Sequence, residues 1–275
     1  MINGFEYDEL GIYYGDDIVV NKHFTVTIPT IRQIKQFGER RYFQTVHNFT
    51  SVGADLKWQL WDLGIDYTKI EDYELFVRLI SQLVSSKRDL YQELIQKPEN
   101  ERNGIDESDL NELLINPLQL IIKDIDFADY EPYKLNDTGQ LILYDSVHGI
   151  TFDRMAYMIC VDAIRKIHGY TRNNERPANK QTKMDLIEDA RDASMAAAQK
   201  PFKSVLQPLV STLQVITGQC GDERILDMPI SMLLDNVRRQ NKVQDGTLLM
   251  QGAYSGFSSL KGIDKTRLDI FGDLN

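Results

Sequence analysis

Between residues 29 and 95, apolar side chains recur every three or four positions, which is the spacing of one helix face. Three such stripes follow each other, over 31–46, 54–63 and 73–84, with polar and charged residues between them. The pattern predicts a helical domain over 29–95 that contains amphipathic helices.

Two local signals mark the ends of these predicted helices. Gly64 follows the second stripe, and glycine most readily takes the left-handed conformation that closes a helix. Thr68 and Glu71 precede the third stripe with the spacing of a capping box, in which both side chains accept backbone N–H groups. We therefore predict that the third helix begins just after Thr68.

The beginning and the centre of the chain follow a different period. Apolar and polar residues alternate over 18–20 and 24–28, which predicts a hairpin or two edge strands in an N-terminal β arm, residues 1–28. Further on, an apolar run over 118–125 and two short runs around the turn-forming residues 136–139 also predict strands. We expect a short antiparallel sheet from this central region.

Helical spacing returns after the predicted strands. One stripe begins after Thr151, a favourable residue for the N-cap of a helix, and others cover 181–199, 202–217 and 229–241. We assign residues 118–243 to a second domain that combines the strands with these helices.

Two segments lack a convincing period. Residues 96–116 are polar and predict a linker, whereas the C-terminal arm, residues 244–275, is rich in glycine yet keeps large apolar side chains. Such an arm either orders against a partner or folds back as a strap on its own chain, and the sequence leaves both open. The predicted fold class is mainly α with a smaller β part (α+β): helical bundles flank a short antiparallel sheet, with extended N- and C-terminal arms.

The charge balance narrows the function classes. The chain is 42% hydrophobic and 26% charged, with a formal net charge of -10. A protein that binds nucleic acid through phosphates presents a basic stripe, whereas the short basic clusters here stand near acidic residues. No apolar run approaches the roughly 20 residues that span a bilayer. We expect neither nucleic-acid binding nor membrane binding.

The sequence holds no local motif that carries catalysis. The phosphate-binding patterns GxxxxGK[ST] and GxGxxG and the nucleophile pattern GxSxG are missing. His168 ends a predicted helix, where an imidazolium would favour the carbonyl dipoles. Asp124, Asp126 and Asp129 cluster near a predicted strand, which keeps a metal-dependent enzyme as a minor hypothesis. We predict a non-enzymatic protein without a cofactor or a metal site.

Several stretches along the chain, taken together, resemble a protein family. They are IPTIRQI (28–34), ADLKWQLWDLGIDY (54–67), EDYELF (71–76), PFKS (201–204), LDMPI (226–230), GAYSG (252–256), IDK (263–265) and LDIFG (268–272). Their arrangement resembles a family from the structural gene modules of tailed bacteriophages of Gram-positive bacteria. The resemblance spans most of the chain, and the nearest role within it is that of a tail assembly chaperone.

The resemblance implies a protein that coats the helical tape-measure protein, recruits tail-tube subunits and leaves before the tail matures. The implied partners are these phage tail proteins and further copies of the chain, and the implied location is the host cytoplasm. This chain is longer than the common short chaperone and has a strand-rich centre. A structural virion subunit of the neck, tail or baseplate, which oligomerises through its terminal arms, therefore remains the alternative.

Aromatic side chains are frequent anchors of protein contacts. We assign partner binding to Trp58 and Trp61 on the second predicted helix, and to Tyr254, Phe257 and Phe271 in the C-terminal arm. For the tryptophans, a core position is an alternative interpretation. Stacking on nucleic acid is disfavoured because basic residues do not interleave with these aromatics.

Overall fold

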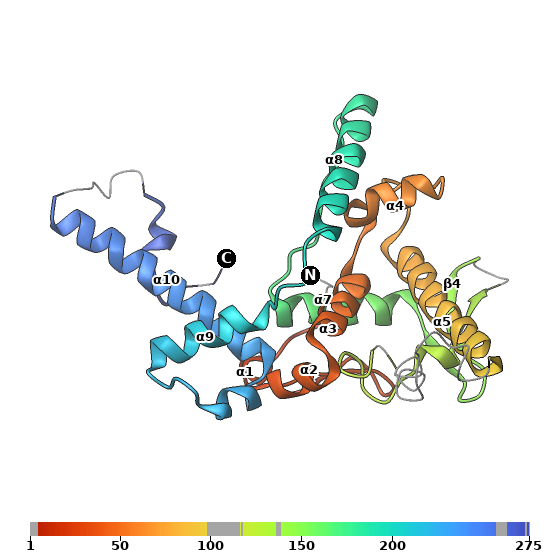
Figure 1. Cartoon of the computed structure of the whole chain (residues 1–275), viewed down its shortest axis with the longest axis horizontal. Helices are drawn as coiled ribbons and strands as arrows, with labels where there is room; N and C mark the ends of the chain where they lie inside the picture. The colour runs from red at the N-terminus through yellow and green to blue at the C-terminus, as the bar shows by residue number, and fades with distance from the viewer. Residues whose placement is uncertain are drawn as a thin grey trace.

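The computed structural model describes residues 5–97, 116, 118–135, 139–256, 263–272 and 274. Helices dominate, with small antiparallel sheets, which confirms the predicted fold class (Figure 1). Most of the predicted linker, residues 98–115, lies outside the described residues. The helices are α1 (Glu9–Tyr14), α2 (Ile31–Phe37), α3 (Glu39–Thr50), α4 (Lys57–Asp62), α5 (Asp72–Gln96), α7 (Arg154–His168), α8 (Lys180–Ala198), α9 (Leu206–Thr217) and α10 (Ile230–Tyr254). The strands are β1 (Ile18–Val19), β2 (Thr25–Val26), β3 (Glu131–Lys134), β4 (Leu141–Asp145) and β5 (Ile150–Phe152).

Helix α7 runs through the middle of the molecule (Figure 1). It buries Tyr157, Cys160 and Ile164 among others, and it contacts α3, α5, α10 and β2. Because α7 is covered from several sides, segments between Ile12 and Leu233 contribute to one core cluster. Burial of each large apolar side chain there contributes about 1.5–3 kcal/mol relative to exposure.

The start of α7 differs from the prediction. Thr151 lies in β5, which pairs antiparallel with β4, and it does not cap the helix. Asp153 is the N-cap, and its side chain accepts the N–H of Ala156 at 2.8 Å. A carboxylate at this position satisfies one of the free N–H groups of the first turn. The helix ends, as predicted, at Gly169, whose φ of 63° is left-handed.

His168, in the last turn of α7, is not the imidazolium that we predicted. The side chain is buried, its Nδ1 lies 2.8 Å from the Ile164 carbonyl oxygen, and its Nε2 lies 2.9 Å from the Tyr42 hydroxyl. Burial lowers the pKa of His168 to about 4. At neutral pH the imidazole is therefore uncharged, donating at Nδ1 and accepting the Tyr42 proton at Nε2.

The N-terminal segment contains the predicted hairpin, with β1 paired to β2. It also contains helix α1, which the alternation of residues did not predict. Asp8 opens α1 by accepting the N–H of Gly11 at 2.9 Å, and Gly15 closes it with a φ of 90°. Ile12 and Phe24 from this segment are buried in the core cluster.

Residues 118–125, predicted to form a strand, form turns instead. Asn116 fixes the first turn, because its side chain accepts the N–H of Leu118 and donates to the Ile125 carbonyl. Only Ile122 makes a bridge to the neighbouring β2 strand within the described part of the segment. The turns bury Leu118, Ile121, Ile122 and Ile125, which explains a mostly apolar segment without strand geometry.

The helical part between residues 29 and 95 contains the predicted helices with two corrections. Gly38, with a φ of 100°, divides the first stripe into α2 and α3. The predicted capping box before α5 is wrong, because the Thr68 hydroxyl donates to Asp66 at 2.7 Å and belongs to the preceding turn. Helix α5 instead begins at Asp72 with Glu71 as its N-cap.

The polar segment between α7 and α8 is docked on the helices around it. Arg172 forms a two-pronged ion pair with Asp72, at 2.9 and 3.0 Å, and Glu175 pairs with the buried Lys57 at 2.5 Å. These contacts place α8 against α4, where Ile187 joins a second, smaller core cluster. The far end of α8 projects from the body (Figure 1).

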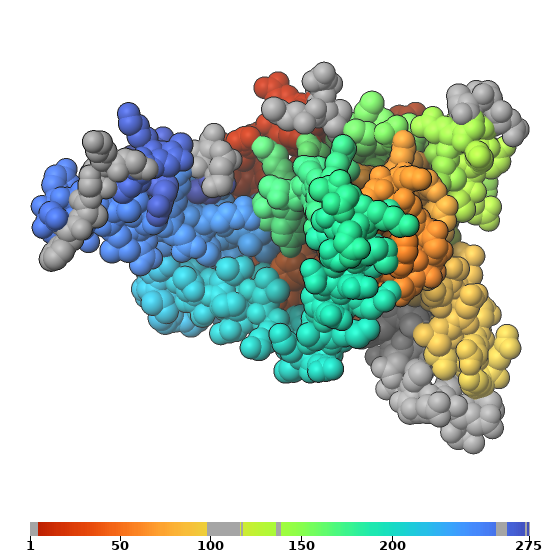
Figure 2. Space-filling view, turned by 90° about the horizontal axis from the view of Figure 1, so that it is seen from above, coloured from red at the N-terminus to blue at the C-terminus, as the bar shows by residue number. Residues whose placement is uncertain are grey.

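Helix α10 continues to Tyr254, well past its predicted end, and with α9 it forms a separate lobe in the space-filling view (Figure 2). Residues 263–272, which we call the strap, fold back on α10. The Arg239 guanidinium donates to the carbonyls of Ile270 and Gly272 at 3.2 and 2.7 Å. Of the two interpretations left open for the C-terminal arm, these residues follow the second, a strap on the same chain.

Candidate functional site

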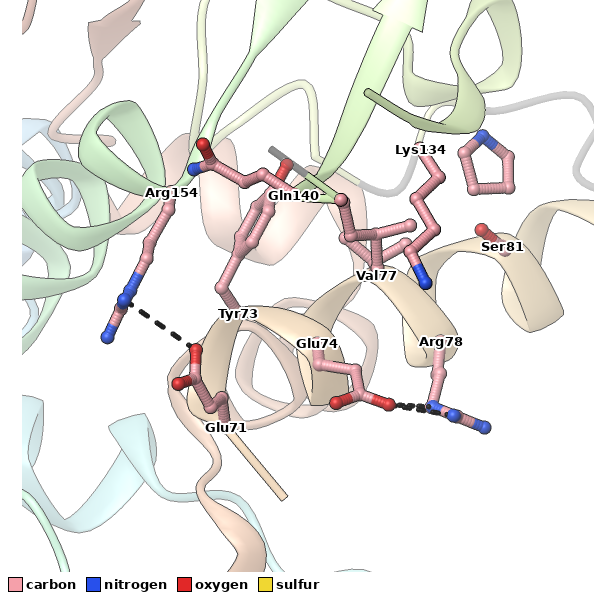
Figure 3. A pocket seen from close by; sticks show the side chains of 12 residues that line it. Glu71, Tyr73, Glu74, Val77, Arg78, Ser81, Lys134, Gln140 and Arg154 are labelled. Atoms are coloured by element: carbon pink, nitrogen blue, oxygen red, sulfur yellow. Dashed lines mark hydrogen bonds and ion pairs between the residues drawn. The ribbon is translucent and has the colours of Figure 1, made fainter. Parts of the chain in front are cut away.

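A groove of about 760 Å³ lies between helix α5 and the β3–β4 hairpin and is open to solvent (Figure 3). Its helical wall consists of Glu71, Glu74, Val77, Arg78 and Ser81. These residues are spaced by three or four positions, so that they share one face of the helix. The wall spans about 15 Å, because each helical residue rises 1.5 Å.

The opposite wall comes from segments distant in the sequence. Strand β3 contributes Pro132 and Lys134, strand β4 contributes Leu141, and the first turn of α7 contributes Arg154. Strand β3 is an edge of the sheet and is exposed along its length. Proline is tolerated on such an edge because no ladder N–H is required there. The Lys134 side chain points from the hairpin toward α5 (Figure 3).

Tyr73 fixes the helix to the sheet at the base of the groove. Its hydroxyl donates to the Phe152 carbonyl at 2.5 Å and accepts the N–H of Leu143 at 3.2 Å. Burial raises the pKa of Tyr73 above its ordinary value, so the phenol stays protonated and able to donate. A single side chain thus joins α5 to both β4 and β5.

The charges around the groove are mostly paired. The closest contact between Arg154 and Glu71 is 3.7 Å, and Arg78 holds Glu74 at 2.7 Å. Within the described residues no ion pair involves Lys134. Pro132, which is exposed, and Leu141, which is half-buried, provide apolar surface on the hairpin side, whereas Val77 at the base is buried in the core. The arrangement is suited to binding an apolar strip that carries flanking charges.

The acidic cluster considered for a metal has a structural role. Asp124 stands in a turn with a φ of 57°, and Asp126 caps the short 3-10 helix η3 (Phe127–Asp129) by accepting the N–H of Ala128 at 2.9 Å. The strand that was predicted beside these aspartates does not form. No group of three or more potential metal ligands converges within the described part of the chain.

The two tryptophans assigned to partner binding are in contact with side chains of α8. Trp58 is half-buried beside the second core cluster, and Arg191 lies 6.0 Å from the centre of its ring. Trp61 is 40% exposed, with the Lys183 ammonium 5.8 Å from its ring centre. Cations of the same chain therefore occupy one side of each ring, which leaves less of either indole for a partner.

The aromatic residues assigned in the C-terminal arm are placed differently. Tyr254 is 85% exposed at the end of α10, and Phe271 is 89% exposed on the strap. Phe257 lies outside the described residues. The structure brings Tyr254 and Phe271 into the same lobe but not into the groove beside α5.

Comparison with known proteins gives no relative. No protein-family model matches the chain, and neither a curated protein nor a solved structure matches it. Among the described helices, none combines the length and apolar character needed to cross a membrane.

Sequence reasoning found the helix that forms one wall but did not predict the groove. Tyr73 and Val77 stand in the predicted stripe of the third helix, where they were assigned to its apolar face. They line the same groove as Leu141, which is distant from them in the sequence, and no local residue spacing predicts such a long-range contact. Pro132 carried a signal that was available, since a proline inside a strand indicates an edge.

Proposed function

We propose that this chain is a non-enzymatic tail morphogenesis protein of a tailed bacteriophage, and that it acts as an assembly chaperone in the host cytoplasm. The observation that carries the proposal is the groove beside α5, in which Pro132 and Leu141 of the hairpin face a helix whose charges are paired. The sequence resemblance supplies the clients, which are the tape-measure and tail-tube proteins.

The geometry of the groove matches the expected client. A tape-measure protein is a long amphipathic helix, and an amphipathic helix binds by laying its apolar face in a groove. A wall of about 15 Å accommodates on the order of ten residues of such a helix. Pro132 and Leu141 would contact its apolar face, while Lys134 is placed to meet an acidic flank.

Filling the groove tests this proposal. Ser81→Trp places an indole in the groove, whereas Ser86→Trp makes the same change on α5 outside the groove lining. On co-expression with the tape-measure protein, we expect Ser81→Trp to lower the amount of co-purified client about tenfold, the loss typical of a blocked interface centre.

Ser86→Trp should match the wild type in this experiment, and circular dichroism should show that both variants are folded. Equal client recovery with both variants would show that the groove is not the contact. Loss of recovery with both would indicate a general defect of α5.

A second candidate function is a structural virion subunit of the neck, tail or baseplate. The strap favours it, because a terminal segment that docks on a helix outside the core can serve as a link between subunits. Stoichiometric copies in purified mature particles, measured by mass spectrometry, would support this candidate over the chaperone.

A further inference from the structure

The seat of the strap on α10 has the features of a specific binding site. Besides the Arg239 contacts, Arg267 of the strap forms a two-pronged ion pair with Asp245 of α10, at 3.0 and 2.8 Å. Gly246 lets the two backbones approach, since a Cβ atom there would lie 3.0 Å from both the Arg267 carbonyl oxygen and the Ile270 Cγ2. The Arg239 guanidinium and Gly246 thus contact the strap backbone, and the Asp245 carboxylate binds the Arg267 side chain.

The strap contacts α10 rather than the body of the protein. An open cleft of about 1690 Å³ is lined by the strap, α10, α1 and the end of α7, and it lies between the strap and the last two of these elements. None of the described apolar residues of the strap belongs to either core cluster. Lifting the strap from α10 would therefore leave the core intact.

The first half of α10 holds the helix to the body. Ile230 and Leu233 are buried in the core, and Arg238 donates to the His168 carbonyl at 2.5 Å. The second half, which carries Asp245 and Gly246, runs outward in a lobe that other molecules can approach (Figures 1 and 2). The seat of the strap is accordingly on a projecting part of the molecule.

We propose that the strap of one copy docks on α10 of a second copy, so that two chains exchange straps. The proposed partner is a second copy of the chain, because the surface of α10 that holds the strap already fits residues 263–272, and a second copy carries the same residues. Exchange preserves the Arg267–Asp245 and Arg239–carbonyl contacts, so each seat is filled by the same groups as within one chain. The inference deepens the second candidate function, because it names the contact between subunits.

Charge reversal in separate chains tests the exchange. Asp245→Arg alone and Arg267→Asp alone each place like charges together, whether the strap docks on its own chain or on an identical copy. When the two variants are mixed, exchanged straps pair opposite charges at both seats. We expect native mass spectrometry to show a 1:1 heterodimer at more than about tenfold the dimer level of either variant alone.

The double variant Asp245→Arg with Arg267→Asp is the matched control, since it restores the pair within a chain and between chains. It should behave as the wild type does at every concentration. A mixture that remains monomeric across concentrations, while the double variant has wild-type stability, would show that the strap binds only its own chain. That outcome concerns the strap alone, whereas the proposed function is tested by client recovery and by particle composition.

Discussion

At the scale of single residues, the contact between His168 and Tyr42 gives a pH dependence with a definite sign. The pKa of His168 is about 4 in the folded protein and about 6.5 in an unfolded chain. The unfolded state therefore binds more protons between these values, and stability is lost as the pH falls from about 6.5 to about 4. We expect the free energy of unfolding to be about 2 kcal/mol lower at pH 5 than at pH 7 from this group.

Urea unfolding of two variants at both pH values isolates this effect. His168→Gln should remove most of the difference between pH 7 and pH 5, although it lowers stability at both. His47→Gln changes an exposed histidine and should leave the difference unchanged. A difference that survives in His168→Gln would contradict a neutral, buried imidazole in the core.

Substitution of Gly53 and Gly64, which flank α4, tests whether the backbone there tolerates a side chain. A Cβ atom at Gly53 would lie 2.2 Å from the Tyr67 carbonyl oxygen, so the backbone would have to move. At Gly64 nothing lies within 4 Å, but the φ of +72° disfavours a side chain. Gly53→Ala should cost about 3 kcal/mol and Gly64→Ala about 1 kcal/mol. Thermal unfolding would contradict this account if Gly64→Ala were the more damaging change.

At the scale of elements, the polar segment before α8 depends on the pair between Glu175 and Lys57. The Lys57 side chain is 11% exposed, so that losing its carboxylate partner leaves a nearly buried cation. Glu175→Gln should lower the free energy of unfolding by about 1–3 kcal/mol. Glu93→Gln breaks an exposed lysine–glutamate pair of similar length and should have little effect. Equal effects of the two changes, measured in urea, would refute the docked segment.

Elements with a clear period could be predicted from the sequence, and those held by distant contacts could not. The stripe of α7 is regular because several elements pack around it. Residues 118–125 are mostly apolar because turns fixed by Asn116 bury Leu118, Ile121, Ile122 and Ile125, a composition that resembles that of a buried strand. The second half of α10 was not predicted, because Gly246 is a poor helix former. The strap that packs against Gly246 comes from a later segment of the chain, and this contact is not visible in the local sequence pattern.

The same distinction applies to the candidate site. The helix that forms one wall could be predicted because the apolar residues of α5 obey helical spacing. The hairpin wall could not, and neither could the hydrogen bonds from Tyr73 to β4 and β5. Trp61 was assigned to partner binding only because aromatic residues are common at interfaces. Its contact with Lys183 of α8 could not be predicted, because it depends on how the polar segment between α7 and α8 docks.

At the scale of the whole molecule, a central core carries outlying surfaces. Helix α7 organises the core, while α8 and the lobe of α9 and α10 project from it (Figure 1). Exposed apolar side chains on the outlying parts, such as Val215 at 69% and Leu248 at 59%, add surface for protein contacts. A body with several separate contact surfaces suits a protein that brings other proteins together.

The central proposal is that the chain binds the tape-measure protein of a tailed phage during assembly. Its most direct test follows the location of the chain during infection by a phage that carries its gene. Quantitative mass spectrometry would compare tape-measure complexes isolated from infected cells with purified mature particles. We predict many copies of the chain in the complexes and none in the particles. Stoichiometric copies in mature particles, with none on the free tape-measure protein, would contradict the chaperone account.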